Sequence, residues 1–471
     1  MQSMAVILLA GLILTSGSAV ATVKPNALFA DGAVLQQGIR VPVWGTAADG
    51  EKVTVAFGNQ KASTTAKDGK WMVRLKPLKA GGPFVMTIAG TNTIELKNVL
   101  VGEVWIASGQ SNMQWPLRAT TDAQAVIAAS KDPMMRLFTV TRKTSAAPVG
   151  EVEGTWVESA PETVPEFSAV AYFFGRDLRK ALNVPVGMIN SSWGGTRVEA
   201  WTPLPVLQAD PDFAESVKDI KDYGAAPNHA AALYNGMIAP LVPCALRGAI
   251  WYQGESNAGQ AYRYEKRFTN MITSWRKDWG EGNFPFLFVQ LAPFGKIVTE
   301  PGDSNWAELR EAQLETSLHC PNTGMAVITD YGEAANIHPQ QKAPVGARLA
   351  LAAEAMTYRQ RVTYKGPLYK SMKVQGNQAI LTFSDAKGGL ERKGGELTGF
   401  AVAGADRRFY NAHASISGDK VIVSSPDVPT PVAVRFGWAD VPIVNLFNKA
   451  GLPATPFRTD DWPMATAPKK Q

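Results

Sequence analysis

Residues that commonly bind metals or form disulfides are scarce in this sequence. Its 471 residues include two cysteines, Cys244 and Cys320, and four scattered histidines. None of them forms a CxxC or HxxxH pair, the spacings that are typical of zinc sites. The sequence therefore predicts no metal and no cofactor, and any chemistry must come from ordinary side chains.

Charge is also sparse, and it is not concentrated in any segment. Charged residues make up 19% of the chain, and 47 Lys and Arg against 41 Asp and Glu leave a net charge of +6 with no dense basic run. A protein that binds nucleic acid usually carries a concentrated basic surface, so we expect no nucleic-acid partner. The 45% hydrophobic content suits a folded enzyme of two or three domains.

Long hydrophobic runs are missing apart from one at the N-terminus. Residues 4–14 are apolar and lead to Ala19-Val20-Ala21, an A-x-A pattern typical of signal-peptide cleavage. A membrane anchor is the alternative, since Met1-Gln2-Ser3 carries no Lys or Arg, but the run is shorter than the ~20 residues that span a bilayer. We expect a signal peptide over residues 1–21, a secreted or periplasmic protein, and no stable membrane insertion.

The pattern of turns and apolar runs divides the rest of the chain into three domains and a tail. Residues 22–98 and 360–462 show short alternating or β-branched strands between Gly, Asp and Pro residues, as in β-sandwiches. Residues 99–359 alternate apolar strands with helical patterns, which predicts an α/β domain with a flavodoxin-like parallel sheet. Residues 463–471 form the tail, which we expect to fray from Ala465 to Gln471. The strands expected in the central sheet are residues 101–108, 186–192, 246–252, 284–291 and 325–329.

Polar and glycine residues follow these strands at the edge where sites form in doubly wound sheets. Ser111 follows the first strand, Gly194-Gly195 the second, Gln253 the third, and His338 lies beyond the fifth. A nucleophile, backbone donors, a side-chain donor and a base are the groups that acyl transfer requires. Each residue alone has a structural explanation, such as a helix cap for the serine. Together at one edge they predict an active site.

Several segments resemble those of a known family. GQSNM at 109–113, WGGT at 193–196, LYNGMI at 233–238, WYQGESN at 251–257 and IHP at 337–339 resemble bacterial sialate O-acetylesterases and related carbohydrate acetylesterases of the SGNH hydrolase superfamily. The resemblance runs almost end to end. It implies a three-layer α/β/α core flanked by N- and C-terminal β-sandwich domains. It also implies serine esterase chemistry on acetylated sugars, without a metal or cofactor.

The resemblance also implies roles for individual residues. Ser111 would be the nucleophile and His338 the base that removes its proton. The oxyanion hole would combine the backbone N–H groups of Ser111 and Gly195 with the side-chain amide of Gln253, and loss of one such donor typically costs ~10²–10³ in rate. Glu255 would either support the site or hold its turn. Residues that would shape the sugar site, although packing and surface pairing explain them equally well, are Trp193, Arg197, Glu199 and Asn257.

The sequence leaves open which group orients His338. Many relatives place an Asp shortly before the histidine, whereas here Asn336 stands two residues upstream. An Asn oxygen accepts the imidazole N–H but does not stabilise imidazolium as a charge does. Asp330, Glu333 and a backbone carbonyl are the alternatives. We favour Asp330 because it directly follows the fifth strand, although a loop-capping role explains it equally well.

The substrate and the oligomeric state are also left open. O-acetylated sialic acid is the first expectation, and acetylated xylan or xyloglucan is the alternative. A weakly active glycan-binding protein is a third possibility, suggested by Asn336 and the two β-sandwiches. The dilute positive charge suits an anionic sugar but does not select it.

The two cysteines are expected to remain free thiols in spite of export. Cys244 precedes the third strand and Cys320 the fifth, so the fourth strand would hold them roughly 10 Å apart, two strand spacings. Cα separations that a disulfide can bridge end near ~7 Å. The sequence therefore predicts two free, buried cysteines.

Overall fold

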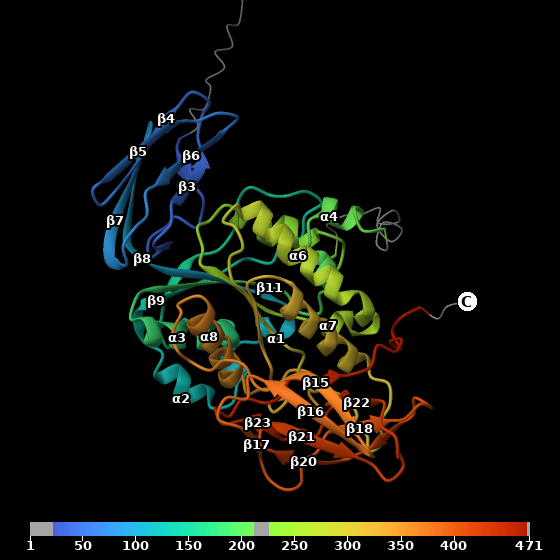
Figure 1. Ribbon diagram of the computed structural model, residues 1–471. Coiled ribbons are helices and arrows are strands. Elements are labelled where there is room, and N and C mark those ends of the chain that lie inside the picture. Colours follow the sequence, from blue (N-terminus) through green and yellow to red (C-terminus); the bar gives the residue numbers. More distant parts are fainter. Residues whose placement is uncertain (1–21, 212–225, 469–471) are drawn as a thin grey trace, which may run out of the picture.

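The computed structural model describes residues 22–211 and 226–468. Figure 1 shows three regions in chain order: N-terminal strands, a central region of strands and helices, and C-terminal strands. The expected signal peptide, residues 1–21, lies outside the described residues. Among the described helices, none is long and apolar enough to cross a membrane.

The central sheet carries the expected strands in the expected order. Its path is β10-β9-β11-β8-β12-β13-β14, and the strands from β9 to β14 along this path run parallel. The pair β9 and β10 extends the sheet beyond the five strands that the sequence predicted. The carboxyl ends of the five strands therefore meet at one edge. The strand bounds are β8 Thr93–Gly109, β9 Asp132–Thr139, β10 Trp156–Ser159, β11 Val186–Ser192, β12 Gly248–Tyr252, β13 Phe286–Val289 and β14 Thr323–Ala326.

Helices cover both faces of this sheet. Alternate residues of β8 point to opposite faces, as in any strand: Val104 and Ile106 belong to one buried cluster, and Trp105 and Ala107 to another. The first cluster includes residues of α6 (Tyr264–Trp279) and α7 (Asn305–His319), and the second includes residues of α3 (Ala169–Leu182) and α8 (Ala343–Met356). The sheet is thus buried on both sides, which explains the continuous apolar strands of the sequence.

Short helices and turns lie mainly at the ends of the central strands. They are α1 (Ser111–Gln114), η1 (Leu117–Ala119), α2 (Ala123–Ala128), η2 (Val198–Trp201), α4 (Leu204–Gln208), η3 (Tyr234–Ile238), η4 (Ala239–Leu241) and η5 (Glu255–Arg263).

One long strand joins the N-terminal region to the central sheet. The sequence predicted separate strands on either side of position 98, but β8 runs without a break over 17 residues. Its first half pairs with β7 and its second half with β11 and β12. The expected boundary at 98/99 therefore falls inside a strand. The other N-terminal strands are β1 (Lys24–Pro25), β2 (Val34–Gln36), β3 (Val41–Thr46), β4 (Lys52–Phe57), β5 (Gln60–Thr65), β6 (Lys70–Leu75) and β7 (Gly81–Ala89).

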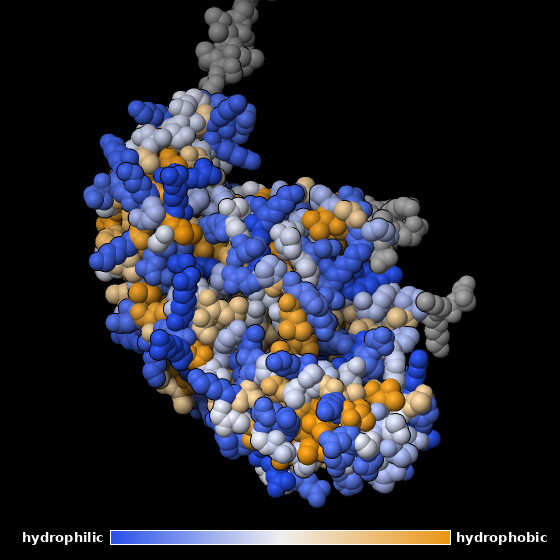
Figure 2. All heavy atoms as spheres, viewed as in Figure 1, coloured by the Kyte–Doolittle hydropathy of each residue, from blue (hydrophilic) through white to orange (hydrophobic). Residues whose placement is uncertain are grey.

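The C-terminal region contains two four-stranded sheets and one two-stranded sheet, with a buried hydrophobic cluster of their residues. In Figure 2 hydrophilic residues dominate the visible face, and hydrophobic residues gather in small groups, including one over these strands. The strands are β15 (Leu368–Gln375), β16 (Gln378–Ser384), β17 (Leu390–Arg392), β18 (Phe400–Ala403), β19 (Phe409–Asn411), β20 (His413–Ser417), β21 (Lys420–Ser424), β22 (Ala433–Phe436), β23 (Leu446–Asn448) and β24 (Phe457–Arg458).

The expectation of a frayed tail needs correction at its first residues. The backbone N–H of Ala465 donates to the carboxylate of the buried Glu308 at 2.5 Å, and the hydroxyl of Thr466 donates to the same carboxylate at 2.6 Å. Two charge-assisted hydrogen bonds hold this segment on α7. Residues 469–471 lie outside the described part of the chain.

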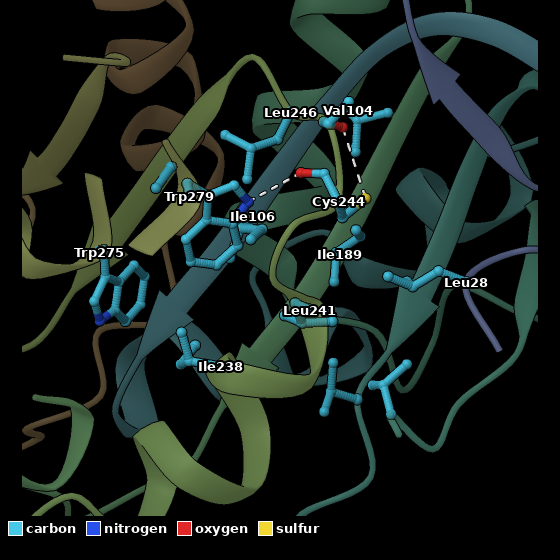
Figure 3. Close-up of a cluster of buried hydrophobic side chains, with 14 of the residues drawn as sticks. Leu28, Val104, Ile106, Ile189, Ile238, Leu241, Cys244, Leu246, Trp275 and Trp279 are labelled. Carbon is cyan, nitrogen blue, oxygen red and sulfur yellow. Dashed lines mark hydrogen bonds between the residues drawn. The ribbon is translucent and has the colours of Figure 1, made fainter. Parts of the chain in front are cut away.

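The structure confirms that both cysteines are free and buried. Figure 3 shows Cys244 among apolar side chains that include Val104 and Leu241, with its carbonyl accepting a hydrogen bond from the indole N–H of Trp279 at 2.9 Å. Burial raises the pKa of the Cys244 thiol to about 12. The strand β13 separates β12 from β14, as the argument for free thiols required.

Candidate active site

The turn after β8 places Ser111 at the start of a short helix. The preceding Gly109 has φ +134°, and a Cβ built on it would lie 2.2 Å from the carbonyl oxygen of Tyr252. Only glycine fits this position, because any side chain would collide with backbone of the neighbouring strand. The close approach of the two strands brings the half-buried Ser111 to the edge of the sheet.

The turn after β11 lies directly against Ser111. A Cβ on Gly194 would be 3.1 Å from the Cβ of Ser111, and the Gly194 N–H donates to Oε1 of Gln114 at 2.7 Å. The next residue, Gly195, is exposed, has φ +73°, and has open space where a Cβ would be. Within the described chain, the N–H groups of Ser111 and Gly195 donate no hydrogen bond. Two backbone donors therefore lie unused beside the serine.

Two contacts hold the loop of His338 against the serine turn. The side-chain amide of Asn112 donates to the carbonyl of Ile337 at 2.9 Å. The imidazole of His338 stacks on Trp115, with ring centroids 4.8 Å apart and an angle of 22° between the planes. The loop of His338 is thus held against the turn that begins with Ser111.

The surroundings of His338 favour its neutral form. Partial burial lowers the pKa of the imidazole, and the nearby charge of Lys342 lowers it further. A neutral imidazole accepts a proton, which is the state that a general base requires.

Asp330, the favoured partner of His338, is bound elsewhere, and this assignment is corrected. Both of its carboxylate oxygens accept hydrogen bonds from the guanidinium of Arg348, at 2.6 and 2.7 Å. Arg348 also donates to the carbonyl of Val327 at 2.6 Å. This bidentate pair fastens the loop to α8, which is the structural role that the sequence left as the alternative.

Glu333 and Asn336, the other side chains considered, bond to each other and to their own loop. The Asn336 amide donates to Glu333 at 3.1 Å, and its oxygen accepts the backbone N–H of His338 at 3.0 Å. The remaining Glu333 oxygen accepts the N–H of Gln340 at 2.7 Å. In the part of the chain that the structure describes, none of these side chains bonds to the imidazole ring.

Gln253 builds the floor of the site, and its predicted role as an oxyanion donor is corrected. The side chain is completely buried, and its amide donates to the carbonyl of Thr196 at 3.1 Å and to Oδ1 of Asn257 at 2.7 Å. Its oxygen accepts the hydroxyl of Tyr264 at 2.7 Å. An amide nitrogen carries two hydrogens, so none is left for a ligand.

Glu199 and Asn257, both predicted to contact sugar, are buried instead. Glu199 pairs with Arg267 in an ion pair whose side chains are 7% and 6% exposed. Asn257 donates to the same carboxylate at 3.0 Å and accepts the N–H of Val198 at 3.0 Å. These residues join the turn after β11 to the turn after β12. Their predicted sugar-binding role is corrected to a structural one.

Trp193 and Arg197 remain accessible beside the glycine turn. Trp193 is half-buried and Arg197 is exposed. The guanidinium of the exposed Arg142 lies 5.8 Å from the centroid of the Trp193 ring. The sequence missed Arg142 because it did not predict β9, after which this residue comes. One arginine thus lies beside the accessible aromatic side chain, and a second, Arg197, is exposed on the turn that follows it.

Lys342 is a further residue that the sequence missed. It is 1% exposed, and its ammonium donates to Oδ1 of Asn112. Asn112 in turn donates to the carboxylate of Glu255 at 2.6 Å. Burial lowers the pKa of Lys342 to about 7 and raises the pKa of Glu255. One feature of the sequence could have pointed to Lys342. It stands four positions after His338 and directly before the Ala-Pro pair with which a helix begins.

The site has no evident place for a metal. In residues 22–211 and 226–468, no group of three His, Cys, Asp or Glu side chains lies close enough together to hold a metal ion.

The chain is similar to known proteins over most of its length. Residues 101–356 match the family model described as carbohydrate esterase, sialic acid-specific acetylesterase. The chain is 29% identical to human sialate O-acetylesterase over 461 residues, 88% of each chain, and 30% identical to the mouse enzyme over 406 residues, 73% of this chain and 75% of that one. The structure of a carbohydrate acetylesterase from Xanthomonas citri has a TM-score of 0.87 and 42% identity, covering 93% of this chain and all of the other.

These matches define a carboxylic ester hydrolase. The chain belongs to the sialic acid-specific acetylesterase family of carbohydrate esterases. Its family supports hydrolysis of acetyl esters on sugars.

Proposed function

We propose that this protein is a serine esterase that removes O-acetyl groups from sugars through an acyl-enzyme, with Ser111 as nucleophile and His338 as general base. The N–H groups of Ser111 and Gly195 form the oxyanion hole. The ring stack on Trp115 and the hydrogen bonds of the His338 backbone and loop orient the imidazole, so we propose a Ser–His dyad without a carboxylate partner.

The reaction proceeds in two halves. His338 takes the proton of Ser111 as Oγ bonds to the acetyl carbonyl carbon, and the oxyanion is stabilised by the two N–H groups. The bond from that carbon to the sugar oxygen breaks, and imidazolium donates its proton to the leaving sugar oxygen, which becomes a hydroxyl group. Water then attacks the acetyl-serine with His338 again as base, and acetate leaves as Ser111 regains its proton.

The observation that carries this proposal is the hydrogen bond from Asn112 to the Ile337 carbonyl at 2.9 Å. It joins the residue after the nucleophile to the residue before the base. A nucleophile and a base act together only when their relative position is fixed.

O-acetylated sialic acid is the proposed substrate. Arg142 places positive charge beside the Trp193 ring, and the exposed Arg197 adds positive charge on the turn that follows it. A sugar carboxylate would be attracted there, and the sugar ring could stack on Trp193. The mammalian relatives carry the name sialate O-acetylesterase. Acetylated xylan or xyloglucan is the alternative, since the similar solved structure is described only as a carbohydrate acetylesterase.

The remaining features follow the same reading. We propose an SGNH-type three-layer core, because helices pack on both faces of a sheet with the expected strand order. The N-terminal and C-terminal strands would form accessory β-sandwich domains. The Ala19-Val20-Ala21 pattern supports export to the periplasm or the medium.

Replacing the nucleophile tests the mechanism. Ser111→Ala should reduce acetate release to background while the melting temperature stays unchanged, since the residue is half-buried and the change is small. The exposed Ser371→Ala is the matched control and should keep full activity. Near-normal turnover by Ser111→Ala would contradict the mechanism.

A comparison of substrates tests the specificity. Acetate release should be measured side by side from 4-nitrophenyl acetate, O-acetylated sialic acid and acetylated xylan. The highest kcat/KM on the sialic acid supports the proposal, and preference for xylan overturns it. Binding of all three without turnover would instead indicate a glycan-binding protein.

A further inference from the structure

We propose that Lys342, Asn112 and Glu255 form a buried positioning centre that holds the His338 loop against the nucleophile turn and places a positive charge near the imidazole. This inference rests on the proposed function. It assigns a role to residues that do not touch the acetyl group, and it accounts for a base that lacks a carboxylate partner.

The side-chain amide of Asn112 forms hydrogen bonds through its oxygen and through both of its hydrogens. Its oxygen accepts from the Lys342 ammonium, and its nitrogen donates to Glu255 at 2.6 Å and to the Ile337 carbonyl at 2.9 Å. Both hydrogens and the oxygen are therefore bound. Asn112 is completely buried, so no water competes for these bonds. Its orientation, and with it the position of Ile337, is fixed from three sides.

Asn112, Glu255 and Lys342 come from three different turns of the chain. Asn112 belongs to α1 after β8, Glu255 begins η5 after β12, and Lys342 directly precedes α8 after the His338 loop. The three residues join the turns that follow separate strands. A displacement of any one turn would break a buried hydrogen bond.

A buried ammonium group at the position of Lys342 is energetically unfavourable. An ammonium at the N-terminus of a helix opposes the helix dipole, and burying it removes its hydration. The groups that face it are the carboxylates of Glu255 and Glu333, the Tyr252 ring at 5.3 Å and the imidazole of His338. A leucine or methionine would pack there at lower cost. The charge is therefore explained by its effect on the imidazole rather than by stability.

The direction of that effect follows from electrostatics. A nearby positive charge disfavours imidazolium and so keeps His338 able to accept the Ser111 proton at lower pH. The pKa of His338 is lowered by burial and by Lys342 together. Removing the ammonium should leave only the effect of burial.

The decisive measurement is the pH dependence of kcat/KM on 4-nitrophenyl acetate. Lys342→Met keeps the side-chain length without the charge and should move the acid limb up by about one pH unit. The kcat at the optimum should fall about 10-fold while KM changes little, since the ester does not touch Lys342. Lys131→Met, an exposed lysine, is the matched control and should leave the profile unchanged.

A second variant covers the case in which Lys342→Met does not fold because Glu255 is left buried without its cation. The double variant Lys342→Met/Glu255→Gln removes both charges and should show the same shift of the acid limb. An unshifted acid limb in either folded variant overturns the proposal. Loss of stability with an unchanged profile would also overturn it, because a merely structural role predicts that result.

The imidazole can also be observed directly in the unmodified protein. His338 should titrate below the ordinary value of about 6.5 in an NMR titration, with its signal assigned by its loss in His338→Gln. Titration at or above that value contradicts the inference. If Ser111→Ala remains active, the proposed function fails whatever the His338 titration shows, so the two failures are distinguishable.

Discussion

Two carboxylates at the carboxyl edge of the central sheet are paired with cations in different ways. Glu199, after β11, forms a direct ion pair with the guanidinium of Arg267. Glu255, after β12, is joined to Lys342 through hydrogen bonds to the amide of Asn112. The first pair is hydrogen-bonded to Asn257, which accepts from Gln253, whereas Asn112, which joins the second pair, also bonds to the loop of His338.

The difference teaches which part of the site is fixed and which responds to pH. Arginine does not lose its proton in proteins, so the pair of Glu199 and Arg267 is a constant brace. Burial lowers the pKa of Lys342 to about 7, so the second group changes charge near neutrality. The glycine turn is therefore held permanently, and the histidine loop is held by a titratable group.

Breaking the direct pair should have the largest effect on stability. Arg267→Met leaves the carboxylate of Glu199 buried with only the Asn257 amide, and loss of one partner of a buried pair typically costs ~3–5 kcal/mol. Chemical denaturation should show a correspondingly lower midpoint. The double variant Arg267→Met/Glu199→Gln should recover much of the loss, since no charge then remains buried. A loss below about 1 kcal/mol in the single variant, as for an exposed pair, would contradict the comparison.

Changing pH should reveal the titratable pair. Unfolded lysine keeps its proton up to about pH 10.4, whereas Lys342 in the folded protein loses it near pH 7, so the unfolded state binds more protons in between. The free energy of unfolding should therefore rise with pH in this window, by up to about 1.4 kcal/mol per unit. The raised pKa of Glu255 acts in the opposite direction at lower pH, above 4.5.

The measurement is denaturation of the wild type and Lys342→Met between pH 7 and pH 9. Stability of the wild type should increase relative to the variant across this range. A constant difference between the two proteins would show that Lys342 keeps its charge, and the contrast with Arg267 would then disappear.

Asp330→Asn distinguishes a loop-fastening carboxylate from a catalytic one. The variant weakens the pair with Arg348, whose side chains are 18% and 9% exposed, and should lower stability by about 1–2 kcal/mol. Its kcat should change less than about 10-fold, against the ~10⁴ that such a change costs when the Asp orients a catalytic histidine. A loss of that larger size would restore Asp330 as the partner of His338.

This last case illustrates what the sequence could and could not predict. The apolar strands followed from hydrophobic pattern, and their order agrees with the flavodoxin-like arrangement that we assumed for such a sheet. From that arrangement we expected Ser111, Gly195 and His338 at one edge of the sheet. The positions where strands end can be predicted from the pattern of hydrophobic residues along the chain. The partner of Asp330 is Arg348, which lies in the first turns of the helix that follows the loop. Spacing in the sequence does not reveal which side chains meet in the folded protein.

The same limit explains the other corrections. Gln253 and Asn257 lie in the expected turn. Their amides, however, bond to Thr196 and Glu199, which the fold packs against them. Lys342 was missed because a lysine is normally assigned to the surface. The sequence thus predicted the turns that carry the candidate site, while the hydrogen-bond partners of their side chains required coordinates.

The smallest predicted effect concerns the accessible side of the fixed turn. Arg142→Gln removes an exposed positive charge beside the Trp193 ring, and Arg197→Gln removes one on the turn that follows it. For each variant we expect KM for O-acetylated sialic acid to rise about 3-fold to 10-fold with little change in kcat. Kinetics at rising salt should show the same loss in the wild type, because exposed charges are screened. 4-Nitrophenyl acetate, which carries no charge, is the control substrate and should be unaffected by either variant. Equal changes on both substrates would mean that the arginines shape the turn rather than attract the sugar carboxylate, and the proposed preference for sialic acid would lose its structural support.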